Sequence, residues 1–366
     1  MDWSVTGYPY DIGVNVVHQT NVDVKLGSLE GVQINGMSIT ENYYSDSRVQ
    51  AKVKTVVEEG ASDGYIENGR LRIILSVPSR SFYEELITGY VSDIDETTEK
   101  GYTQRTYTVE GTIWGLLEHR MKDPVIIAPG ATMIDTWSQL MMFQTRMQYS
   151  TAGAQDLTFH NTILYEPGSV LSTILFEISS GYSRMDVNGH GVVTLTKYTS
   201  PSNKTPTRTI DYNDIRGLAM TPLTKNSAKY QTPGRAIVTA TVSREQNGET
   251  VQEVIAGSYD APSNSWVSLD SRGYLTSIAD SYNGASETPS VTELNNIAQQ
   301  NWNEAQDKGV EWTGKTIFAD YHAGEVAYLI LPSKENQNGT NFIKVLVSQV
   351  NTNLDTMVQD LTLKEV

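Results

Sequence analysis

The sequence contains no cysteine, and this absence removes several kinds of chemistry at once. Disulfide bonds, cysteine-ligated metal sites and cysteine nucleophiles are excluded along the whole chain. The composition leaves the redox compartment open. Any covalent catalysis would have to use another side chain.

Long apolar runs and an N-terminal export signal are also missing. No segment approaches the ~18 consecutive apolar residues that a transmembrane helix requires. The start, Met1-Asp2-Trp3-Ser4, lacks the basic and apolar regions of a signal peptide. We therefore expect a soluble protein that is made in a cytoplasm and does not insert into a membrane.

The sequence lacks the short motifs that identify common enzyme classes. There is no G-x-S-x-G elbow, Walker A loop or strand-anchored G-x-G-x-x-G. The acidic stretch from Asp93 fails as a calcium loop, because Thr98 and Gln104 occupy positions six and twelve. We expect a charged hairpin loop there instead. None of the histidines has a metal-ligand spacing to another: His18, His119, His160, His190 and His322.

We therefore predict no catalytic, cofactor-binding or metal-ligating residues, no cofactor, and a protein that is not an enzyme. One enzymatic alternative stays open. The chain has 43 acidic residues, so a carboxylate pair suited to glycoside hydrolysis can arise by chance. A cell-wall hydrolase is consequently our third hypothesis.

Basic residues are scarce relative to acidic ones. The chain has 27 Lys and Arg against 43 Asp and Glu, for a formal net charge of −16. Wrapping around duplex DNA by neutralising its phosphates is unfavourable at this charge. A surface that lets DNA pass without adhesion could well be acidic.

What the chain does have is length and β-strand pattern. Its 366 residues, 39% of them hydrophobic, are enough for two or three packed domains. Residues 1–118 predict six or more strands at close spacing, typical of a β-barrel domain. The strands are expected at 14–17, 22–26, 34–39, 48–56, 71–75, 86–94 and 102–109, with a hairpin turn at Asn68-Gly69.

Residues 119–205 predict an α+β insertion domain. Thr132 is placed to cap one helix, and Ser169 a second helix that ends before Gly181. A hairpin turn at Asn188-Gly189 follows. The Pro/Ser/Thr-rich residues 200–207 predict a linker.

Residues 206–366 predict a second β-barrel domain that resembles the first. Strands are expected at 235–242 and 251–255, then an exposed polar segment over 257–287. One helix is expected at about 290–308, where Ser290 and Glu293 form a capping box. Apolar runs at 326–332, 342–347 and 357–363 predict the closing strands.

The 20 tyrosines form the clearest group of side chains. Tyrosine suits half-buried strand faces and subunit interfaces. The same side chains could also form a carbohydrate-binding platform. Those in or beside predicted strands are Tyr43, Tyr44, Tyr65, Tyr90, Tyr102, Tyr107 and Tyr328.

This order of parts resembles the tail hub proteins of tailed phages and the equivalent hubs of phage-derived contractile particles. The likeness is carried by the Asn68-Gly69 hairpin followed by 89–92, and by 107–111 at the entry to the insertion. It continues in 235–239, the helix from Ser290, and the closing segments 345–347 and 357–363.

The resemblance implies a mainly β fold in which two similar small β-barrel domains flank an α+β domain. It also implies a homotrimer that forms a pseudo-six-fold ring, joins the tail tube to the three-fold tip and lets DNA pass during ejection. Expected partners are a tail tube or distal tail protein ring, a tape measure protein, and tail spike or fibre proteins. Double-stranded DNA would pass transiently, without specific binding.

The expected location is the tail tip or baseplate of the virion, after synthesis in the host cytoplasm. Because the sequence ends at Val366, directly after the last predicted strand, we expect any peptidoglycan hydrolase to reside in another protein. A carbohydrate- or receptor-binding β module is the alternative to the hub hypothesis.

Overall fold

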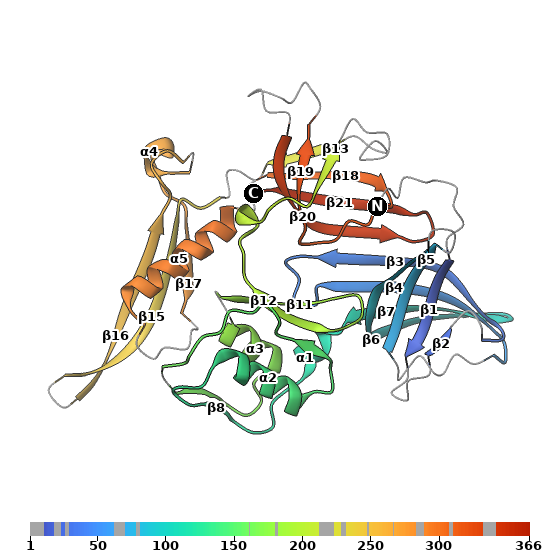
Figure 1. The fold of residues 1–366 in the computed structure, drawn as a ribbon, viewed down its shortest axis with the longest axis horizontal. Coiled ribbons are helices and arrows are strands. Elements are labelled where there is room, and N and C mark those ends of the chain that lie inside the picture. The colour runs from blue at the N-terminus through green and yellow to red at the C-terminus, as the bar shows by residue number, and fades with distance from the viewer. Residues whose placement is uncertain are drawn as a thin grey trace.

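The computed structural model describes residues 11–17, 23–25, 29–61, 70–77, 81–160, 162–179, 182–211, 223–227, 232–246, 249–265, 267–282, 289–306, 310–331 and 342–366. The predicted turn at Asn68-Gly69 and the glycine at Gly181 lie outside these residues. The fold is mainly β, as the strand pattern predicts, and the α-helices of these described residues lie in two places, at the insertion and beside a small separate sheet (Figure 1).

The N-terminal part is an antiparallel sheet in which apolar and polar side chains alternate. In β4, for example, Ala51, Val53 and Val57 are buried while Lys52 and Lys54 are exposed. The strand order is β3-β4-β7-β6-β5-β1-β2. The strands are β1 (Asp11–Val17), β2 (Asp23–Lys25), β3 (Val32–Asn42), β4 (Val49–Glu58), β5 (Arg70–Val77), β6 (Phe82–Glu99) and β7 (Tyr102–Gly111).

The prediction of a charged loop between β6 and β7 is wrong, because both strands continue through the residues assigned to that loop. Asp95 pairs with Thr106 and Glu99 with Tyr102, so only Lys100 and Gly101 form the turn. In its outer half, from Asp95 on β6 to Thr106 on β7, no side chain on either face is buried. Because neither face of this outer half is buried, apolar and polar residues do not alternate along it. The sequence pattern therefore gave no sign that the two strands continue.

The α+β insertion follows and has its own core around Trp137, Met133 and Leu175. Thr132 caps α2 as predicted, since its hydroxyl accepts from the Asp135 amide at 3.3 Å. Ser169 does not cap α3, because its hydroxyl donates backwards to the Glu166 carbonyl at 2.7 Å. The elements are α1 (Trp114–Glu118), β8 (Val125–Ile127), α2 (Met133–Gln144), β9 (Tyr149–Ser150), β10 (Ile163–Tyr165), α3 (Leu171–Ser179), β11 (Ser183–Val187) and β12 (Val193–Lys197).

The C-terminal β part packs around the buried Trp312 and Leu363. It begins after a short 3₁₀ turn (Pro201–Asn203) in which Pro201 is buried, so the predicted linker is partly packed. The strands are β13 (Arg208–Asp211), β14 (Thr224–Ser227), β18 (Val310–Ile317), β19 (Val326–Ile330), β20 (Phe342–Asn353) and β21 (Val358–Glu365).

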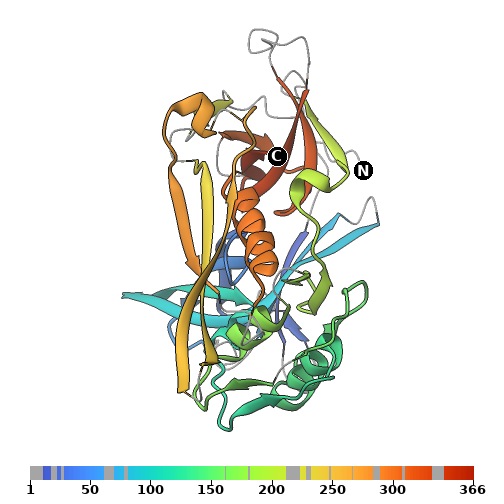
Figure 2. The ribbon, with the colours of Figure 1, turned by 90° about the vertical axis from the view of Figure 1, so that its left-hand side faces the viewer.

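A separate three-stranded sheet interrupts this part, with α5 packed across it (Figure 2). The segment predicted as exposed and polar over 257–287 is mostly unburied in its described residues, although strand and helix occupy part of it. All five residues of β17 are exposed, so nothing in their polarity indicated a strand. The elements are β15 (Arg235–Gln246), β16 (Glu249–Asp260), α4 (Leu269–Arg272), β17 (Ser277–Ser281) and α5 (Val291–Gln306).

The two β parts join edge to edge in one sheet. β20 pairs antiparallel with β3, from Gln349 opposite Asn42 to Asn353 opposite Ser38. Within the described residues the pairings form an open path with a branch at β20, and neither part closes into a barrel. The expected arrangement of two β domains flanking an α+β insertion is thus present, and in the described residues these two domains are lobes of one continuous sheet without a closed barrel.

One face of this sheet is polar across both lobes. Directly opposed residues share a face, and six neighbouring strands from β18 to β7 contribute one unbroken polar row. The adjacent cross-strand row has its side chains on the opposite, core-facing side of the sheet. It consists of Thr352, Ile39, Ala51 and Val109. The polar row consists of Lys315, Asp360, Asn351, Thr40, Gln50 and Glu110.

Candidate functional site

The three parts of the chain meet at Tyr43, in the turn after β3. Its amide donates to the Ser348 carbonyl of the C-terminal lobe at 2.9 Å. From the insertion, Arg184 donates to the Tyr43 carbonyl at 2.8 Å and lies 3.5 Å from the centre of the tyrosine ring. The ring is buried against Val326 and Leu346. Tyr43 is thus a contact shared by all three parts.

The turn at 320–325 brings the C-terminal lobe onto this junction. Two of its residues, Asp320 (φ 56°) and Gly324 (φ 96°), have left-handed backbone conformations. Aspartate and glycine are among the residues that tolerate this conformation best. The Gly324 amide donates to Val347 at 2.8 Å, and the Ala323 amide donates to the Glu41 carboxylate at 3.0 Å. The turn is therefore held by β20 on one side and by β3 on the other.

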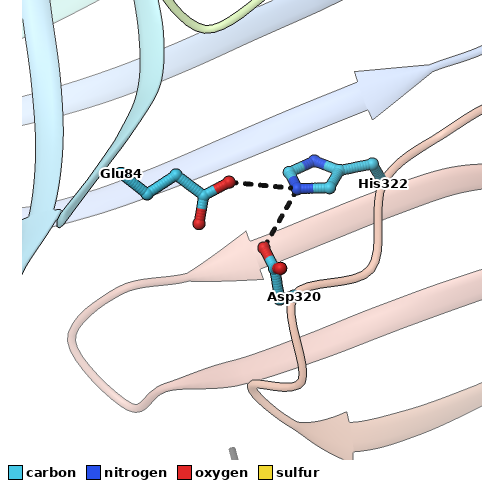
Figure 3. Close-up of side chains that lie close together, drawn as sticks. All are labelled: Glu84, Asp320 and His322. Carbon is cyan, nitrogen blue, oxygen red and sulfur yellow. Dashed lines mark hydrogen bonds and ion pairs between the residues drawn. The ribbon is translucent and has the colours of Figure 1, made fainter. Parts of the chain in front are cut away.

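His322 lies at the centre of this turn, between carboxylates from both lobes. Its Nδ1 is 3.0 Å from Glu41 Oε1 on β3. Its Nε2 is 3.0 Å from Asp320 Oδ1 and 3.3 Å from Glu84 Oε1 on β6. Figure 3 shows the Asp320 and Glu84 carboxylates converging on that one nitrogen. Both ring nitrogens are thus engaged.

The electrostatics of the cluster follow from burial and these contacts. Burial on its own would lower the pKa of His322, but the hydrogen bonds to Asp320, Glu41 and Glu84 outweigh it and raise that pKa far above its ordinary value. Burial raises the pKa of the Glu84 carboxyl. For Asp320, burial raises the pKa, but the hydrogen bonds to His322 and Glu84 and the charges of His322 and Arg208 together outweigh it and lower that pKa. At neutral pH the imidazole is therefore a cation that ties the lobes together.

The insertion docks on the same region through its hairpin turn. Gly189 lies so close to β6 that a Cβ there would sit 1.6 Å from the Glu85 carbonyl oxygen. The neighbouring His190 pairs with the Glu85 carboxylate at 2.8 Å. Only glycine fits this approach, so the Asn188-Gly189 turn predicted from sequence also serves as a contact surface.

Between these groups lies a half-open pocket of about 310 Å³. Acidic side chains (Glu41, Glu84, Asp186) and basic ones (Arg48, Arg184) line it together. A pocket with both signs of charge suits ionic cross-linking between elements, or a small ion, better than an extended apolar ligand.

Sequence reasoning did not find this site, and the reason is separation along the chain. Glu41 and His322 are far apart in sequence, and Glu84 comes from a third segment. The turn at 320–325 directly precedes the closing strand predicted at 326–332, but no sequence signal indicated its partners. The expectation of no site residues stays a prediction.

The singled-out tyrosines fall in different environments. Tyr43 and Tyr107 are buried, Tyr44 and Tyr328 are exposed, and Tyr65 lies outside the described residues. They therefore form no single surface. In the described part of the chain, no helix has both the length and the apolar character needed to cross a membrane.

Comparison with known proteins gives structural matches but no sequence match. No family model matches the chain, and no curated protein matches it. The chain superposes on a tail protein from Neisseria meningitidis with a TM-score of 0.66, at 11% identity over 98% of this chain and 97% of that one. It superposes on a 43 kDa prophage tail protein from Shewanella oneidensis with a TM-score of 0.67, at 9% identity over 97% and 98% of the two chains.

A third match is an E. coli component of the type VI secretion system, described as structurally similar to T4 bacteriophage tail proteins. The TM-score is 0.54, at 7% identity over 93% of this chain and 76% of that chain. The predicted likeness to tail hub proteins is thus confirmed at the level of the fold.

Proposed function

We propose that the chain is a structural hub of a phage tail tip or baseplate. The observation that carries this proposal is the full-length fold match: nearly all of this chain superposes on nearly all of a phage tail protein. A match of one lobe alone would be consistent with a generic β domain. A match through both lobes and the insertion supports a shared architecture.

The finer part of the proposal is a homotrimer in which each chain supplies two β lobes, so that three chains form a pseudo-six-fold ring. The edge-to-edge pairing of β3 with β20 supports it, because it fixes the two lobes side by side. We also propose that residues 1–118, 119–205 and 206–366 are the structural units of each subunit, with α1 at the end of the first unit packed into the core of the second.

We further propose that the polar row and its neighbours face the passage through the ring. The row holds one basic and two acidic side chains, with Lys315 and Asp360 paired at 3.1 Å and Gln50 hydrogen-bonded to Glu110 at 2.5 Å. A face of amides, hydroxyls and paired charges offers little net attraction to DNA phosphates. With two carboxylates against one ammonium, the row is weakly acidic, in line with the acidic surface expected of a non-adhesive passage.

The proposed hub is not an enzyme. In support, both ring nitrogens of His322 already form hydrogen bonds with carboxylates. This arrangement suits a residue that holds segments in position better than a free general acid or base. Its proposed partners are a tail tube or distal tail ring, a tape measure protein, and a spike or fibre. Its proposed place is the virion.

The deciding experiment is electron microscopy of particles that carry a tagged copy of the chain. We expect label at the tail end distal to the capsid. Label on the capsid or along the tube, or a monomeric mass in both the purified chain and its complexes, would contradict the hub. Peptidoglycan clearing by the purified chain would overturn the non-enzyme proposal.

A further inference from the structure

The side chains around His322 Nε2 are arranged as ligands converging on one point. Glu84 Oε1 and Asp320 Oδ1 approach the same nitrogen, although one N–H can be directed at only one of them. Within the residues that the structure describes, Glu84, Asp320 and His322 form the one group of three such side chains close enough to share an ion. They come from β6 and from the 320–325 turn, and so from different lobes.

We propose that Glu84, Asp320 and His322 bind one divalent transition-metal ion, which cross-links the N-terminal and C-terminal lobes. One imidazole nitrogen and two carboxylate oxygens are ligands that Zn²⁺, Co²⁺ and Mn²⁺ accept. Binding replaces the proton that Nε2 otherwise carries, so a proton leaves the ring when the ion enters.

The two separations measured from Nε2 match those between neighbouring ligand atoms of one ion. With metal–ligand bonds of about 2.0–2.2 Å, neighbouring ligand atoms lie about 2.8–3.6 Å apart in octahedral or tetrahedral geometry. The two separations from Nε2 are 3.0 Å and 3.3 Å. All three ligand atoms lie within 4.8 Å of one another.

Glu41 supplies the second feature of a metal-binding histidine. Such a histidine usually donates its other ring N–H to a carboxylate, which fixes the ring and increases its basicity. His322 Nδ1 is 3.0 Å from Glu41 Oε1, and Glu41 Oε2 is itself held by the Ala323 amide at 3.0 Å. The imidazole is thus oriented with Nε2 towards the two ligand carboxylates.

Charge and an unpaired atom support the same conclusion. Three half-buried carboxylates converge on a single imidazole, and a divalent ion offsets the repulsion that such a group has when all its carboxylates are ionised. Glu84 Oε2 is buried and has no hydrogen-bond partner among the described residues. That oxygen is available for a bidentate contact with an ion or for a bound water.

The experiment uses the full chain, stripped of metal with a chelator and titrated with Zn²⁺ or Co²⁺ near neutral pH. We expect one equivalent of tightly bound ion by calorimetry and elemental analysis, a higher melting temperature, and visible absorption from bound Co²⁺. A folded wild-type chain that takes up no stoichiometric ion overturns the proposal.

Substitutions assign the ion to this cluster. Glu84→Gln, Asp320→Asn and His322→Gln should abolish uptake, and Glu41→Gln should weaken it by about 10–100-fold. The matched controls are His190→Gln and Glu96→Gln, which change an exposed histidine and a carboxylate farther along β6. Circular dichroism of each variant checks the fold. Equal binding by controls and ligand variants places the ion elsewhere and refutes the assignment.

Discussion

At the scale of single residues, the molecule depends on a few close contacts between segments that are distant in sequence. Tyr43 accepts from Arg184 through its carbonyl and packs its ring beneath the guanidinium. Gly189 admits the β6 backbone where any side chain would collide. These contacts fix how the insertion sits on the N-terminal lobe.

Gly189→Ala should separate the insertion from β6. The added methyl would lie 1.6 Å from a backbone oxygen that cannot rotate away, so we expect a loss of about 1–3 kcal/mol or more in unfolding free energy. Hydrogen exchange should rise in β11 and β12. His190→Ala in the same turn removes an exposed imidazole and its contact with the Glu85 carboxylate, and should cost less, about 1 kcal/mol. Equal effects of the two changes would refute the close-contact argument.

Arg184→Met should weaken the same junction through polar contacts. It removes a charged hydrogen bond to the Tyr43 carbonyl and a cation–π contact, together worth about 2–4 kcal/mol in a largely desolvated position. Arg120→Met is the matched control, since Arg120 also donates to a carbonyl but is exposed. Chemical denaturation measures both. An equal loss of stability in Arg184→Met and Arg120→Met would contradict a special role of Arg184 at this junction.

At the scale of secondary-structure elements, the sequence predicted strands and helix caps correctly where one face of the element is buried and apolar residues alternate with polar ones. β4 and β21 alternate strictly, and the sequence located both. Neither face of β17 is buried, and neither face of the outer half of the β6–β7 hairpin is buried. Apolar and polar residues therefore do not alternate in these strands. The pairing of β3 with β20 could not be predicted either, because register between distant strands is set by tertiary packing. The histidine cluster was hidden for the same reason.

Ser290→Ala should destabilise α5 and the small sheet beneath it. The Ser290 hydroxyl accepts from the Glu293 amide at 3.1 Å, and losing an N-cap costs about 0.5–2 kcal/mol. Thr292→Ala, two residues later on an exposed position, should leave stability nearly unchanged. Thermal melts compare them. No difference between the two variants would remove Ser290 from its capping role.

At the scale of the whole molecule, the continuous sheet gives the chain one polar face and, behind it, the core side of each lobe. The proposed ring places the polar face around the passage. The natural absence of cysteine makes this testable, because an introduced thiol is the single reactive site.

Asn351→Cys and Lys52→Cys place a thiol on the polar face. Once that thiol has reacted with a bulky maleimide, we expect the otherwise normal particles to release their DNA no longer. The physical reason is steric, since the reagent would project into the proposed passage. Lys197→Cys, exposed on β12 of the insertion, is the control and should leave release unchanged. Infectivity and dye-monitored DNA release report the result. Unhindered release from fully labelled polar-face variants would exclude this face from the passage.

The pairing of β3 with β20 also has a consequence in time. The partner of β3 is synthesised roughly 300 residues later, which at ~5–20 residues per second leaves that edge open for about 15–60 s on the ribosome. An open strand edge can recruit another copy of the same nascent strand. Slow stretches of translation between the lobes should therefore raise aggregation during expression, and faster completion of β20 should lower it.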